Sequence, residues 1–209
     1  MRGHALARTD QPVAQAEDAI DVGSLRLAGR ATFLAIGTLG LSAIALALYF
    51  GDAGEVFGPV SDVLVAASFA LLAPAVVAVR RLAVGAAGRW FDALSAAALG
   101  GLVVAVAGQL LLVAGVLPLQ GSFVTLGIGA ILLVAWAAGS AVLAFRHEVP
   151  GRDVGRWSLA LVGLTLVTAV GTPALGLGTA ELSVVFGIPL LVASVGWLVA
   201  LARDLLRRA

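Results

Sequence analysis

Residues 93–117 read ALSAAALGGLVVAVAGQLLLVAGVL, a run of twenty-five residues without one charged side chain. A helix rises about 1.5 Å per residue, so this run is long enough to cross the hydrocarbon core of a bilayer, which is about 30 Å thick. Backbone amides inside that core must find hydrogen-bond partners within their own segment, which favours a helix. The run therefore predicts a membrane span.

Five further stretches on either side of this run have the same character. They cover residues 31–50, 63–79, 123–145, 157–174 and 182–202, and none contains Asp, Glu, Arg or His. Breaks with Gly or Pro separate them, and the alternating pattern of a membrane β-barrel is missing. We predict an all-α, polytopic membrane bundle of six transmembrane helices in residues 29–209. Residues 1–28 are predicted to be a disordered cytoplasmic tail without the apolar core of a signal peptide, ending in a short amphipathic stretch on the membrane surface.

The overall composition supports a membrane protein and excludes several other classes. The chain is 61% hydrophobic and 12% charged, against about 25% charged in ordinary soluble domains. A chain with this composition has too few polar residues to cover the surface of a soluble enzyme or a nucleic-acid-binding protein. Cys is absent, which excludes disulfides, thiolate metal sites and cysteine nucleophiles.

The distribution of charge predicts the orientation of the chain. With six spans, all 13 Arg lie on the side of the two termini, and that side has a net charge of +5. The opposite loops hold only acids and have a net charge of −4. Because positively charged loops stay in the cytoplasm, both termini are predicted to be cytoplasmic. An Arg-rich face of this kind is expected to attract anionic lipid headgroups.

A short motif recurs before every second span. Gly-Arg stands at residues 29–30, 88–89 and 155–156, each time at the start of an odd-numbered span. One interpretation is three tandem helical hairpins. The alternative is that the motif reflects only the ordinary preference of Arg and Trp for the cytoplasmic interface of a membrane span. Trp follows Gly-Arg at two of the three positions, Trp90 and Trp157.

Residues that could carry chemistry are scarce. The two His, His4 and His147, lie outside the spans, so Ser140 has no partner base within the membrane. Met1 is the only Met, so no span offers an axial Met or His to a haem. We therefore predict no catalytic residues, no cofactor and no metal site, and expect that the protein is not an enzyme.

Small residues suggest how two of the spans pack. Ala97, Gly101 and Ala105 follow one another at four-residue intervals in the third span, while Gly127 and Gly139 lie in the fourth. Small side chains let two helices approach closely in a membrane. We expect these two spans to pack together on these faces.

Four further residues have both a structural and a functional interpretation. Gln109, the most polar residue within a span, is predicted to hydrogen-bond to a neighbouring helix, or else to contact a solute. Pro74 and Pro189 are predicted to kink the second and sixth spans, or else to line a solute path. Asp62 is predicted to cap the start of the second span, or else to form an outward-facing site.

The composition, rich in Ala, Val, Leu and Gly and without Lys, resembles that of small six-span membrane proteins of bacteria with GC-rich genomes. We therefore expect a multi-pass protein of a bacterial cytoplasmic membrane. Its expected role is a non-enzymatic accessory, assembly or regulatory component that contacts a membrane-protein partner or a second copy of itself. The alternative is a carrier or channel for a small neutral or lipid-like solute.

Overall fold

The computed structural model of the chain describes residues 21–51, 54–175 and 187–209. Every regular element in these ranges is a helix. The helices are α1 (Val22–Phe50), α2 (Phe57–Leu82), α3 (Gly88–Val113), α4 (Leu119–His147), α5 (Arg152–Leu175) and α7 (Ile188–Arg207). In the described ranges, α1, α2, α3, α4 and α7 are long and apolar enough to cross a membrane, and α5 is not among them. The prediction of an all-helical protein with several helices that could span a membrane is confirmed, whereas the count of six spans and the orientation stay predictions.

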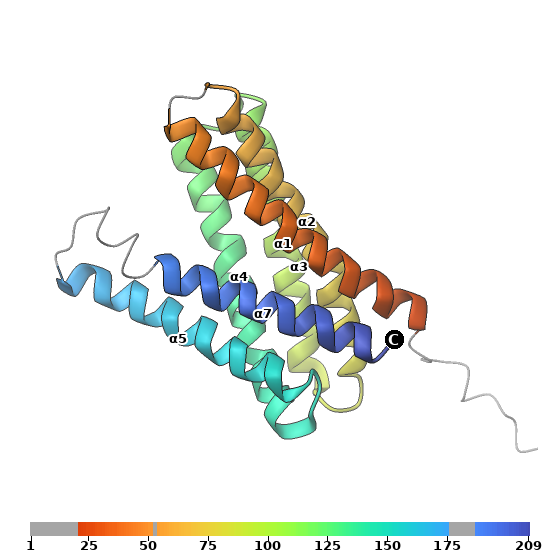
Figure 1. Ribbon diagram of the computed structural model, residues 1–209. Coiled ribbons are helices and arrows are strands. Elements are labelled where there is room, and N and C mark those ends of the chain that lie inside the picture. Colours follow the sequence, from red (N-terminus) through yellow and green to blue (C-terminus); the bar gives the residue numbers. More distant parts are fainter. Residues whose placement is uncertain (1–20, 52–53, 176–186) are drawn as a thin grey trace, which may run out of the picture.

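Each helix contacts the next along the chain, and α7 returns to contact α1. Figure 1 shows α5 and α7 side by side, running obliquely across the group formed by the first four helices. Each of the three expected hairpins thus pairs its own two helices. Residues 1–20, Asp52, Glu181 and the start of the sixth predicted span lie outside the described residues.

The first helix starts earlier than the sequence suggests. A separate surface stretch was expected before residue 31, but α1 runs unbroken from Val22, and Asp21 caps it by accepting a 3.0 Å hydrogen bond from the Gly23 amide. Leu25 is buried in the core, whereas Leu27 is exposed. Residues two apart in a helix point in nearly opposite directions, so only one of these leucines faces the bundle.

The C-terminus contacts both the start of α1 and the turn between α4 and α5. The Arg26 side chain donates to the carbonyl of Ala209 at 3.4 Å, and Arg208 donates to the carbonyl of Glu148 at 2.8 Å. Nearby, Arg80 of α2 pairs with Asp92 of α3 at 2.7 Å. These contacts define one end of the bundle, which we call the arginine-rich end.

The core is built from alanines and a few large rings. Trp136 of α4 stacks on Phe91 of α3, with ring centroids 6.2 Å apart, and meets Trp197 of α7 edge-on at 6.1 Å. The Trp136 indole N–H donates to the Ser95 hydroxyl at 3.2 Å. This aromatic row ties three helices together, and buried alanines let the backbones around it approach closely.

Candidate functional site

The contact between α3 and α4 is close at Gly101 and Ala105, both of which are buried. A Cβ atom added to Gly129 of α4 would lie 2.7 Å from the Ala105 Cβ and 2.7 Å from the Gly101 carbonyl oxygen. A Cβ on Gly139 would collide with the Leu94 side chain. Gly101, Ala105 and Gly139 therefore lie where these two helices meet.

Ala97 and Gly127 do not share this contact, which corrects the expected packing face. Ala97 is exposed, and a Cβ on Gly127 would meet no atom of the described chain within 4 Å. Four residues turn a helix by about 400°, so a row of every fourth residue drifts by about 40° per step and leaves the contact. Gly129 takes the place expected for Gly127.

Gln109 joins the same two helices. Its side chain is buried, and its Nε2 donates to the Ser122 hydroxyl of α4 at 2.6 Å. The preceding Gly108 makes room for Thr125, which would collide with a Cβ there. This geometry is that of an interhelical hydrogen bond.

The two prolines differ from each other. Pro74 lies half-buried inside α2, which continues on both sides of it from Phe57 to Leu82. Pro189 lies in the first turn of α7, where a missing N–H removes no helical hydrogen bond. The residues before Gly187 lie outside the described ranges, so the expected kink at Pro189 stays a prediction.

Asp62 does not cap α2, contrary to the prediction. The helix begins at Phe57, and its N-cap residue, Val56, makes no side-chain hydrogen bond. Pro59 falls in the first turn of α2, where proline is well tolerated. Asp62 therefore lies in the second turn, half-buried.

Hydroxyl pairs between α1 and α2 were not foreseen. Thr38 and Ser68 share a 2.9 Å hydrogen bond, and Ser42 and Ser61 share one of 3.0 Å. The signal available in the sequence was the presence of Ser and Thr within apolar spans, where such side chains often bridge helices.

A partly open cavity of about 270 Å³ lies among α1, α2, α4, α5 and α7. Its wall includes Ala35, Phe69 and Leu133, which stand near the middle of their helices, so the cavity is at mid-height in the bundle. We call it the central cavity. Gln109, Pro74 and Pro189, proposed from the sequence to line a solute path, are not among its lining residues.

The wall of the central cavity is almost entirely apolar. Ser68, Thr165 and Ser194 contribute hydroxyls, and each donates to a carbonyl four residues earlier in its own helix at 2.7–2.8 Å. No charged side chain lines the described part of this wall. Such a cavity suits an uncharged, apolar ligand.

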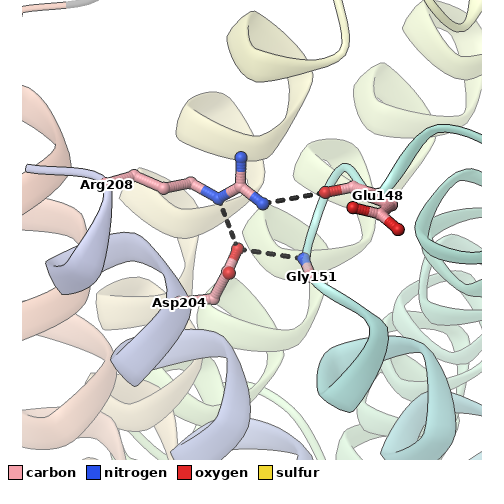
Figure 2. Close-up of polar contacts among 4 residues, drawn as sticks. All are labelled: Glu148, Gly151, Asp204 and Arg208. Carbon is pink, nitrogen blue, oxygen red and sulfur yellow. Dashed lines mark hydrogen bonds and ion pairs between the residues drawn. The ribbon is translucent and has the colours of Figure 1, made fainter.

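A second ordered feature lies at the arginine-rich end (Figure 2). The Asp204 carboxylate of α7 accepts hydrogen bonds from the Gly151 amide at 3.1 Å and from Arg208 Nε at 2.9 Å. Arg208 in turn donates to the Glu148 carbonyl at 2.8 Å. This network fastens the end of α7 to the turn between α4 and α5.

The described residues contain no group of three or more His, Asp or Glu side chains placed to hold a metal ion. The Ser140 hydroxyl is buried and has no hydrogen-bond partner in the ranges that the structure covers.

Comparison with known proteins adds no family to this description. No family model, curated protein or solved structure matches the chain. The central cavity and the arginine-rich end are therefore interpreted from their own geometry.

Proposed function

We propose that the chain is a non-enzymatic, multi-pass protein of a bacterial cytoplasmic membrane that takes an apolar, lipid-like molecule into its central cavity. The observation that carries this proposal is an apolar cavity at mid-height in the bundle, bounded by five helices. Solute sites of membrane carriers often lie near the bilayer midplane, between helices.

The wall sets the class of ligand. A charged group would lose its hydration there without gaining a partner, since the wall hydroxyls already donate within their own helices. The volume of about 270 Å³ is just below the range of ordinary ligand sites, which begins at about 300 Å³. A small neutral molecule or part of an acyl chain fits these limits.

The orientation belongs to the same proposal. The start of α1, the end of α7 and the turn between α4 and α5 meet at the arginine-rich end. By the positive-inside rule this end faces the cytoplasm, so both termini are cytoplasmic.

One observation favours a second function, the accessory role through helix contacts. The apolar part of α1 is the least buried of the membrane-crossing helices, and Cβ atoms on Gly37 and Gly40 would meet no described atom within 4 Å. A helix of another protein could approach α1 closely there.

Quenching of the intrinsic tryptophan fluorescence by a brominated fatty-acid methyl ester tests the leading proposal. Trp197 lines the central cavity and Trp136 contacts its ring, so a probe in the cavity quenches both. We expect a saturable component of quenching for the purified protein in detergent. Ala130→Phe, which fills the cavity, should abolish that component.

The matched control is Gly127→Phe, on the same helix but facing open space. It should leave the saturable component unchanged. Quenching that rises linearly with the probe in all three proteins would refute the cavity as a ligand site. In that case, a partner retained during mild purification and lost on Gly40→Phe would support the accessory role.

A further inference from the structure

A cleft of about 450 Å³ lies between the first turns of α5 and the last turns of α7, and it shares no lining residue with the central cavity. Its walls change in character along the helices. Arg152, Arg203 and Arg207 line it toward the arginine-rich end, whereas Val199 and Ala200 line it nearer the middle of α7. The cleft therefore has a basic end and an apolar end.

The acids in the wall do not cancel the arginines. Asp204 is held by Arg208 and the Gly151 amide, and Asp153 pairs with Arg156 at 3.1 Å. Both Arg208 and Arg156 stand outside the lining of the cleft. Each carboxylate in the wall is therefore paired with an arginine that does not line the cleft.

Two of the three lining arginines have no acidic partner among the described residues. Arg152 pairs with Glu148 at 2.7 Å, but Arg203 and Arg207 have no carboxylate within 4.0 Å in the part of the chain that the structure describes. They are one helical turn apart on α7, so their guanidinium groups lie on the same face. A guanidinium pair of this kind matches the oxygens of a phosphate.

Trp157 forms the junction between the basic and apolar parts. Its ring lies against α7 at Gly196, which has no side chain. A Cβ atom on Gly196 would lie only 2.5–2.7 Å from the ring atoms, so the close contact requires glycine there. The side chain stays 38% exposed. Tryptophan in such a position is typical of the level of lipid headgroups.

We propose that this cleft binds the headgroup of a single anionic phospholipid, with its phosphate between Arg203 and Arg207 and its glycerol and first acyl carbons along Trp157, Val199 and Ala200. The gradient from charge to apolar surface matches the order of groups in a phospholipid. A free phosphate ion would use only the basic end. The inference does not depend on a ligand in the central cavity.

Native mass spectrometry of the full chain, delipidated and titrated with phosphatidylglycerol, tests the proposal. We expect one tightly retained lipid per chain, and much weaker retention of phosphatidylcholine. Arg203→Gln combined with Arg207→Gln should weaken phosphatidylglycerol binding roughly tenfold or more, because each arginine near a headgroup contributes a severalfold factor. Both side chains are exposed, so the variant is expected to fold.

The control combines Arg81→Gln with Arg146→Gln. It removes the same charge from exposed positions outside the cleft and should leave the retained lipid in place. An equal loss in both double variants, or no loss in either, would overturn the proposal. Equal retention of phosphatidylcholine, or displacement of the lipid by millimolar inorganic phosphate, would also overturn it.

Discussion

Replacing Gly129 by alanine should force α3 and α4 apart. The new Cβ would lie 2.7 Å from both the Gly101 carbonyl oxygen and the Ala105 Cβ, about 0.7 Å closer than the 3.4 Å at which ordinary contact begins. One of the two obstacles is backbone, so the relief must come from a shift of a whole helix. Overpacking of this kind typically costs about 1–3 kcal/mol.

Gly127→Ala is the matched comparison, on the same helix two residues earlier. Both substitutions gain the same helix propensity, about 0.5–1 kcal/mol, but only the one at Gly129 meets the neighbouring helix. The free energies of unfolding should therefore differ by about 1–3 kcal/mol in favour of Gly127→Ala. Thermal unfolding of the two purified proteins in the same detergent measures this difference.

Equal stability of the two variants, or greater stability of Gly129→Ala, would refute the close approach of α3 and α4 at this point. The absence of native Cys allows an independent check, because cysteines introduced in pairs form the only disulfides. Cysteines at Ala105 and Gly129 should crosslink readily under mild oxidation, whereas cysteines at Ala105 and Gly127 should not.

Three further outcomes are expected. Gln109→Leu should destabilise the protein by about 1 kcal/mol, because the hydrogen bond to Ser122 is lost. It should leave the saturable probe quenching intact, because Gln109 does not line the central cavity. Unfolding and quenching are measured on the same variant, and a loss of the saturable quenching would reveal a role of Gln109 in solute binding. Asp204→Asn should cost about 1–2 kcal/mol, because a charged acceptor of two hydrogen bonds is lost, and a melting temperature equal to that of the parent would contradict this. Val84 and Val116 are exposed turn residues at opposite ends of α3. In intact cells, a membrane-impermeant maleimide should label Val116→Cys and spare Val84→Cys, because the proposed orientation places Val84 on the cytoplasmic side. The reverse labelling pattern would invert the proposed orientation.

Helix boundaries were harder to predict than the helices themselves. The apolar run 63–79 marks the part of α2 that suits lipid, but the helix extends to Phe57 because Ser61 and Asp62 stay helical. Ser61 is held there by its bond to Ser42 of α1, a contact between residues that the local pattern does not connect. A hydropathy pattern reports where a segment prefers to lie, and a helix ends where its backbone hydrogen bonds end.

The candidate sites were predicted only in part. Gln109 was recognised because a polar side chain stands out in an apolar span, and its partner Ser122 lies on the helix expected to pack there. The central cavity has no such signal, since its wall consists of the same Leu, Ala and Val as the rest of the spans. The cleft between α5 and α7 combines residues that are about fifty positions apart in the sequence.

The sequence alone determined that several helices are long and apolar enough to cross a membrane, because the transfer of a segment into lipid depends on its own composition. Only the tertiary structure decided which face of each helix meets another. In water an apolar stripe identifies the buried face, but in lipid the surroundings are as apolar as the protein interior, so every face of these helices is equally acceptable. The choice of Gly129 over Gly127 therefore rests on how closely two backbones fit, which is a property of the assembled bundle.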